Sequence, residues 1–260
     1  MDIFSFGPIA AVLDATYALV TGLSGALAPV AGTLSGLLAV VALTVIVRAL
    51  LIPVGMSQVR AEYNRRRLAP HIAELQRRHG KDRELLARKT MELYQAEKVS
   101  PFAGMLPLLA QLPVISLVYA VFTHPAISGH ANELLGEHVF GAPLGTSFVG
   151  LTSAGAEVWP AMLVYLVVLG LIAIVTTVSR RVLTLPQPEG AATPGSGGLL
   201  RALSFLPYVT VVFAAFVPLA AAVYILTSTA WTVAERFTLR RLLDPERHRP
   251  DGRIEPSAAR

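Results

Sequence analysis

The stretch TLSGLLAVVALTVIVRALLIPVG, Thr33–Gly55, is a long apolar run that contains a single charge, Arg48. About 20 apolar residues suffice for a helix to cross the roughly 30 Å hydrocarbon core of a bilayer. The stretch therefore predicts a membrane span. A charge inside a span is costly and normally faces a protein interior or a water-filled cavity. The alternative is that the Arg48 side chain bends toward the headgroups, because it lies only about 10 Å of helix rise from the end of the run.

The composition of the whole chain also indicates a membrane protein. Of its 260 residues, 53% are hydrophobic and 15% are charged, which excludes an ordinary soluble domain. There is no cysteine, so disulfides, thiolate metal sites and thiol catalysis are excluded. Further spans are expected at residues 100–122 and 159–179. Residues 202–234 carry no charge, and Pro218 lies near their middle, where proline breaks or begins a helix. This run is therefore one long span or two short ones.

The distribution of Lys and Arg decides between one span and two. None occurs in residues 1–32 or 123–158, whereas eleven lie in 56–99, three in 180–201 and seven in 235–260. Loops rich in Lys and Arg stay in the cytoplasm. The pattern predicts a multi-pass protein with its N-terminus outside, its C-terminus in the cytoplasm, and five spans at 33–55, 100–122, 159–179, 202–217 and 218–234.

The remaining segments are assigned by the same pattern. Residues 8–30 are apolar enough for a sixth span, but Asp14 and the charge pattern favour an amphipathic helix on the outer membrane surface within residues 1–32. Residues 123–158 form an outer loop, whose histidines match no metal-ligand spacing and are expected to be solvated. Residues 180–201 form a cytoplasmic linker, and residues 235–260 form a basic cytoplasmic tail.

The cytoplasmic segment 56–99 is helix-prone, densely charged and interrupted by Gly80, which predicts a hairpin of two helices. A thin apolar stripe that includes Leu68, Ile72 and Leu75 is enough for the two helices to touch. A solvated topology anchor and a mobile basic arm that contacts nascent chains, ribosomal RNA or anionic lipid remain equally open. No aromatic residues are interleaved among the arginines, so recognition of a specific nucleic-acid sequence is not expected.

Several polar residues in the spans are candidates to line a cavity with Arg48. No Asp or Glu lies within the five predicted spans, so Arg48 is expected to be an unpaired, hydrated cation. Each hydroxyl alone is better explained by helix packing or by a bond to its own backbone. Together with the charge they favour a hydrophilic groove formed by Arg48, Thr44, Gln111, Tyr224, Ser228 and Thr232.

Three stretches carry a resemblance to a known family. The first is LTVIVRALLIPV with LAPHIAELQRRHG, the second is MELYQAEKVSPFAGMLPLLAQLPVISLVYAVF, and the third is FLPYVTVVFAAFVPLAAAVYILTSTAWTVAERF. They resemble the YidC family of membrane insertases, which includes mitochondrial oxidase-assembly and chloroplast Albino relatives. The residues at the family's positions are Arg48, Pro53, Pro70, Pro101, Pro107, Gln111, Pro113, Tyr119, Pro207, Pro218, Tyr224, Ser228, Trp231 and Thr232. Glu235 and Arg236 depart from the family, which usually has glutamines there.

The resemblance implies an all-α integral membrane protein of a bacterial cell membrane, without the family's large outer domain. Its five helices would enclose a groove open to the cytoplasm, with Arg48 and Trp231 among its residues. The implied function is a membrane protein insertase and chaperone, working alone or with the Sec translocon, with nascent membrane proteins, the ribosome and lipids as partners. Such a protein is not an enzyme and uses no cofactor or metal. The alternative is a small-solute transporter or channel, but the paired broken helices or intramembrane acids typical of that class are not found in the sequence.

Overall fold

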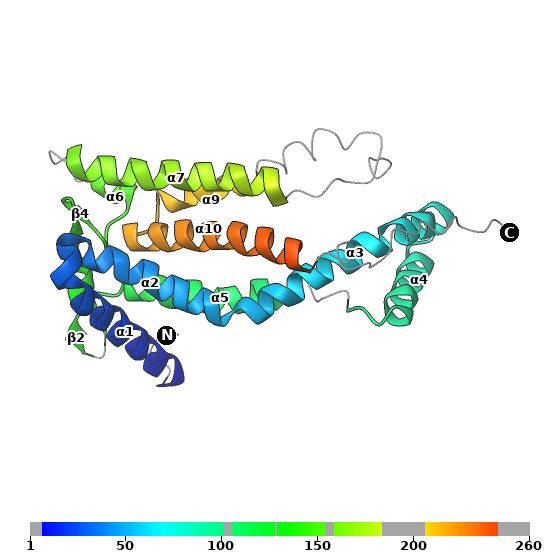
Figure 1. Ribbon diagram of the computed structural model, residues 1–260, viewed down its shortest axis with the longest axis horizontal. Helices are drawn as coiled ribbons and strands as arrows, with labels where there is room; N and C mark the ends of the chain where they lie inside the picture. Colours follow the sequence, from blue (N-terminus) through cyan, green and yellow to red (C-terminus); the bar gives the residue numbers. More distant parts are fainter. Residues whose placement is uncertain (1–6, 101–105, 128, 154–158, 184–205, 244–260) are drawn as a thin grey trace.

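The computed structural model of the chain is an elongated bundle of helices (Figure 1). It describes residues 7–100, 106–127, 129–153, 159–183 and 206–243. Most of the predicted linker at 180–201 and the tail beyond residue 243 lie outside the described residues. Among the described residues, two helical stretches are long and apolar enough to cross a membrane, Gly7–Leu50 and Trp159–Arg181.

The first of these stretches bends back on itself. Helix α1 (Gly7–Ala31) and helix α2 (Ser35–Leu50) are joined by a short 3-10 turn (Gly32–Leu34) and pack against each other. Gly32 takes a φ of 53°, a value that L side chains rarely adopt, which lets the chain turn between the two helices. One face of α1, with Leu13, Val20 and Ser24, is buried. The membrane-surface position of residues 1–32 stays a prediction.

Helix α3 (Ile52–His79) follows α2 after a single non-helical residue, Leu51, and continues along the long axis of the molecule (Figure 1). Helix α4 (Arg83–Ala96) then returns alongside α3. The turn lies at Gly80, as the sequence predicts, and Asp82 caps α4 by accepting a hydrogen bond from Leu85 N at 2.9 Å. Pro70 lies inside α3 without ending it.

The centre of the bundle is helix α10 (Leu219–Leu242), which contacts α2, α3, helix α5 (Leu106–Val121) and helix α7 (Trp159–Leu183). Its first six residues, Leu219–Tyr224, are all buried, and the small side chains among them allow neighbouring helices to approach closely. The expected break at Pro218 is present. A 3-10 turn (Leu206–Tyr208) and the short helix α9 (Val209–Ala214) precede it, and Pro218 begins α10. Residues 202–205 of the predicted span at 202–217 lie outside the described residues, and the rest of it contains the 3-10 turn and the six-residue α9.

The predicted outer loop is folded. Residues 123–153, named the cap here, contain two small antiparallel hairpins in a chain whose described residues are otherwise mostly helical, consistent with the predicted all-α class. Strand β1 (Ala126–Ile127) pairs with β2 (His130–Ala131), and β3 (His138–Val139) pairs with β4 (Ala142–Pro143). A 3-10 turn (Glu133–Gly136) and helix α6 (Phe148–Ser153) complete the cap. Buried Leu134, Val139 and Leu144 join the main core. The sequence predicts only an outer loop at 123–158 and does not predict these elements.

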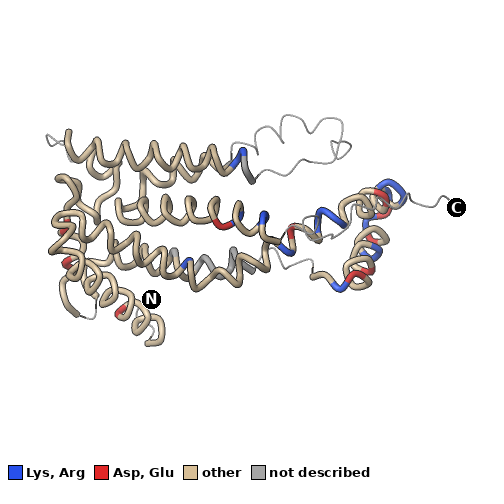
Figure 2. Tube along the Cα trace, viewed as in Figure 1, with Lys and Arg blue, Asp and Glu red and all other residues tan. Residues whose placement is uncertain are grey.

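Charge is distributed unevenly along the molecule (Figure 2). Lys and Arg gather on α3, α4 and the adjoining ends of α7 and α10, whereas the cap and α1 carry acidic residues and no Lys or Arg. The two ends of the bundle therefore differ in their content of Lys and Arg, the property on which the predicted orientation rests.

Candidate functional site

Arg48 lies in the last turn of α2, where α2 packs against α10. Its side chain is half-buried and points to Ser228 on α10. Arg48 Nε donates a hydrogen bond to Ser228 Oγ at 3.0 Å, and Nη2 donates to the same oxygen. Ser228 is 4% exposed, so this contact holds the guanidinium inside the helix bundle rather than at the end of the span. This position argues against simple snorkelling.

Two of the other predicted site residues lie beside this contact. Tyr224 is 3% exposed and precedes Ser228 by one turn of α10, which places it on the helix face that meets Arg48. Thr44 is 1% exposed and lies one turn before Arg48 on α2, but its hydroxyl donates to Val40 O at 2.7 Å. The Thr44 hydroxyl therefore donates to the backbone of its own helix, which is the structural alternative to a groove role that the sequence analysis gave for each hydroxyl.

The remaining predicted residues are arranged differently. Thr232 is half-buried and donates to Ser228 O at 2.9 Å, so it too bonds its own helix. Trp231 is half-buried on α10, between the turns of Ser228 and Glu235. Gln111 belongs to α5, but its side chain lies outside the described residues. The structure thus brings Arg48, Ser228 and Tyr224 together, and leaves Gln111 untested.

Glu235 is a residue of this site that the sequence reading missed. Helix α10 continues unbroken to Leu242, and Glu235 follows Ser228 by seven residues, which places both on similar faces of the helix. Its carboxylate packs against Gly55 of α3 and attracts Arg48. Arg48 therefore has an acidic neighbour, contrary to the expectation of an isolated cation. The seven-residue spacing was visible in the sequence, but Glu235 had been assigned to the tail.

Beyond Glu235, the end of α10 is fastened to α3 by polar contacts that we name the clasp. Arg236 donates to Gln58 Oε1 at 3.2 Å, and Tyr63 donates its hydroxyl to the carbonyl of Arg240 at 2.9 Å. The guanidinium of Arg240 forms an ion pair with Glu62 at 2.7 Å, and both side chains are largely shielded from solvent. The clasp fixes the base of the α3–α4 hairpin relative to the site.

An apolar fissure of about 240 Å³ opens between α5 and the α9–α10 segment. Tyr224 is one of its walls, so the fissure reaches the helix face that carries Ser228. Its lining residues are Ser116, Val118, Tyr119, Phe213, Val217, Ala221, Tyr224 and Ile225.

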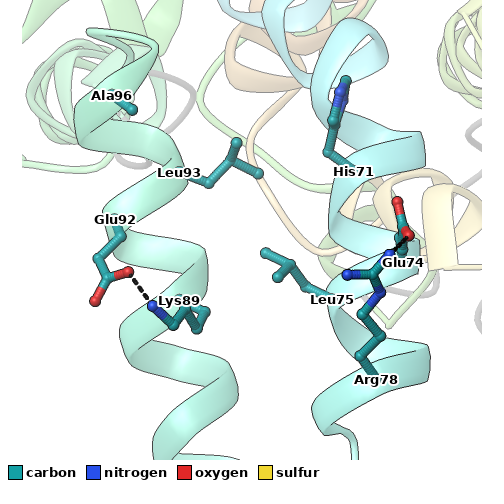
Figure 3. A pocket seen from close by; sticks show the side chains of 8 residues that line it. All are labelled: His71, Glu74, Leu75, Arg78, Lys89, Glu92, Leu93 and Ala96. Atoms are coloured by element: carbon teal, nitrogen blue, oxygen red, sulfur yellow. Dashed lines mark hydrogen bonds and ion pairs between the residues drawn. The ribbon is translucent and has the colours of Figure 1, made fainter. Parts of the chain in front are cut away.

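A second cleft, of about 350 Å³, lies between the two helices of the hairpin (Figure 3). Leu75 of α3 and Leu93 of α4 point toward each other across it, while charged side chains line its edges. Lys89 donates to Glu92 at 2.8 Å, and this hydrogen bond lowers the pKa of the Glu92 carboxyl from its ordinary value. The helices thus touch through few apolar contacts, as expected from the thin stripe in the sequence.

Together, the apolar helices, the charge asymmetry and the arginine held between two helices indicate a helical membrane protein. The sequence profile of the family described as 60Kd inner membrane protein matches residues 28–246. The chain belongs to this family, which contains the YidC insertases and their mitochondrial and chloroplast relatives.

Curated relatives agree with this assignment. A protein of Haemophilus ducreyi named membrane protein insertase YidC is 29% identical over 207 residues, which cover 80% of this chain and 34% of the relative. Proteins of the same name from Mycolicibacterium paratuberculosis and Mycobacterium tuberculosis are 29% identical over 239 residues, covering 80% of this chain and 68% and 65% of the relatives. The chain therefore spans about a third of the Haemophilus protein and about two thirds of the mycobacterial ones.

Proposed function

We propose that the protein is a membrane protein insertase and chaperone, which moves nascent membrane proteins into the bilayer and helps them fold. The observation that carries the proposal is the half-buried Arg48, anchored to Ser228 between α2 and α10 in a chain of this family. A cation at this depth is costly, which favours a role for it. No step in this function makes or breaks a covalent bond.

In the proposed mechanism, a water-containing groove beside α2, α5 and α10 receives the segment of the substrate that must cross the membrane. Acidic and polar groups of that segment lose hydration as they enter, which costs several kcal/mol for a charge. The Arg48 guanidinium, released from Ser228, attracts them at reduced dielectric and lowers this cost. Tyr224 and Trp231 complete the polar wall in this proposal, and Gln111 of α5 is proposed as a groove residue from the family resemblance alone.

The apolar part of the substrate needs a path to lipid. The fissure between α5 and the α9–α10 segment is apolar over most of its wall and begins at Tyr224, next to the proposed groove. A substrate helix that slides along it moves apolar surface out of water, which releases about 25 cal/mol per Å². The cap closes the opposite end of the bundle, because its backbone bonds directly to the start of α10 through Leu219 N to Thr146 O at 2.9 Å.

The basic hairpin is the proposed first contact for nascent chains, the ribosome and lipid headgroups. The charge asymmetry of the molecule supports five spans with the hairpin and C-terminus in the cytoplasm and the cap outside. We further propose that the protein works either alone or with the Sec translocon in a bacterial cell membrane.

The test is insertion of a single-span substrate with an acidic outer segment into proteoliposomes that contain the purified chain. Arg48→Ala is expected to lower insertion about tenfold or more, and Arg48→Lys is expected to retain part of it. Arg181→Ala, which removes an exposed arginine at the end of α7, is the matched control and should insert normally. Full activity of Arg48→Ala on a panel of acidic substrates would remove the charge from the mechanism. Solute flux through the same vesicles, without insertion, would favour a transporter instead.

A further inference from the structure

The carboxylate of Glu235 lies so close to Gly55 of α3 that a side chain at position 55 would occupy the same space. A Cβ atom built on Gly55 of α3 would lie 1.7 Å from Glu235 Oε1 and 2.8 Å from its Cδ. The carboxylate therefore sits directly against the backbone of α3, at the start of the hairpin helix. The clasp begins at the next residue, Arg236, and its other contacts lie further along α10.

The carboxylate lies on the hairpin side of Arg48. Ser228, which holds Arg48, and Glu235 are seven residues apart, or about 10 Å along the axis of α10. Because α10 runs from the cap toward the hairpin (Figure 1), a segment that enters from the hairpin side reaches Glu235 before Arg48. Glu235 is half-buried and attracts both Arg48 and Arg236, so its field is felt inside the site.

We propose that Glu235 is a specificity-determining residue, which limits the negative charge of the segments that this protein carries across and favours segments that include Lys or Arg. The inference rests on the proposed insertase function. A carboxylate at the entrance repels each acidic group that passes it and offsets part of the Arg48 charge. The same carboxylate attracts a basic group, for which Arg48 alone is a barrier. With both Arg48 and Glu235 present, insertion of a segment thus depends less on the sign of its charge than it does with Arg48 alone.

The competing role is purely structural, in which Glu235 only fills the space above Gly55. Charge and shape are separable here, because Gln has nearly the shape of Glu. A structural role predicts that Glu235→Gln changes the insertion of all substrates by the same factor. A specificity role predicts that the factor depends on the charge of the substrate.

The experiment uses the full chain in proteoliposomes and three single-span substrates that differ only in the outer segment, which carries two Asp, two Asn or two Lys. For each variant, insertion of the Asp substrate and of the Lys substrate is divided by insertion of the Asn substrate, which gives the Asp ratio and the Lys ratio. A variant with less folded protein lowers all three insertion values equally, so the ratios do not change for that reason. Glu235→Gln is expected to raise the Asp ratio about three- to tenfold and to lower the Lys ratio by a similar factor. Glu235→Asp keeps the charge and should keep the wild-type ratios.

Two further variants sharpen the test. Gly55→Ala keeps the acid but forces its carboxylate away from α3, and it should move both ratios in the direction of Glu235→Gln. Glu133→Gln removes an exposed acid of the cap, at the far end of the bundle, and should leave both ratios unchanged. Unchanged ratios for Glu235→Gln overturn the inference while the insertase function stands. Absence of any insertion by the wild-type protein overturns the proposed function itself.

Discussion

Gly36→Ala tests whether the cap is locked onto the membrane helices by one acidic side chain. A Cβ atom on Gly36 of α2 would lie 1.6 Å from Glu137 Oε2 and 2.9 Å from a methyl carbon of the fully buried Leu144. The end of Glu137 can swing away, but it then loses the hydrogen bond from Ser24 Oγ at 3.0 Å. A hydrogen bond to a charged group contributes about 1.5–3 kcal/mol, and the helical gain from Ala returns at most about 1 kcal/mol.

The expected result is a net loss of about 1–2 kcal/mol, or a melting midpoint lowered by roughly 2–6 °C for a chain of this size. The measurement is thermal unfolding of the purified protein in detergent. Gly25→Ala is the matched control, since a Cβ there meets nothing within 4 Å and the change should stabilise the helix by about 0.4–1 kcal/mol. Equal midpoints for the two variants would refute the reasoning. So would an unchanged cost of Gly36→Ala in a Glu137→Ala background, where the clash with the carboxylate no longer exists and only the contact with Leu144 remains.

Three further changes probe the cap, the clasp and the hairpin. Tyr165→Phe removes the hydroxyl that donates to two cap carbonyls, at 2.7 and 3.0 Å, and should lower stability by about 1 kcal/mol in the same melting assay. Glu62→Gln breaks the ion pair with Arg240 and should speed limited proteolysis within α3, with unchanged cleavage arguing against the clasp. Lys89→Gln should raise the pKa of Glu92 in an NMR titration, because the hydrogen bond from Lys89, which lowers that pKa in the wild-type protein, is removed. The stabilising effect of the Lys89–Glu92 pair is present at neutral pH and disappears as the pH falls through the Glu92 pKa.

Local features of the fold were predictable from the sequence because they depend on neighbouring residues. Gly80 ends one helix and Asp82 caps the next, and both signals are readable without tertiary information. Pro218 marks the start of α10 for the same reason. The cap was not predictable in this way. Its strands are only two residues long, and its order comes from bonds to distant helices, such as Asn132 to Val121 O and Leu219 N to Thr146 O.

The candidate site was predictable only in part. Arg48 stood out because a charge among apolar residues is costly, and Ser228 was included because it repeats at helical spacing with Tyr224. Which hydroxyl faces the guanidinium depends on how α2 packs against α10, and no local signal encodes that packing. Thr44 and Thr232 have equally suitable spacing, yet both donate to their own helices.

Glu235 shows why a charge count alone misassigns residues near the end of a span. The predicted span ends at residue 234 because the next residue is ionic. The helix has no break there, since its backbone hydrogen bonds do not depend on side-chain charge. The cost of shielding the carboxylate is offset by a glycine on α3 and by the guanidinium groups of Arg48 and Arg236, and of these only Arg236 is adjacent to Glu235 in sequence. Helix α10 therefore links three parts of the molecule through one rigid element. Its first residues bond to the cap, its middle holds Arg48, and its last turns hold the hairpin helix. If the proposed insertase function holds, a substrate that displaces Arg48 from Ser228 acts on the same helix that the clasp fastens to α3.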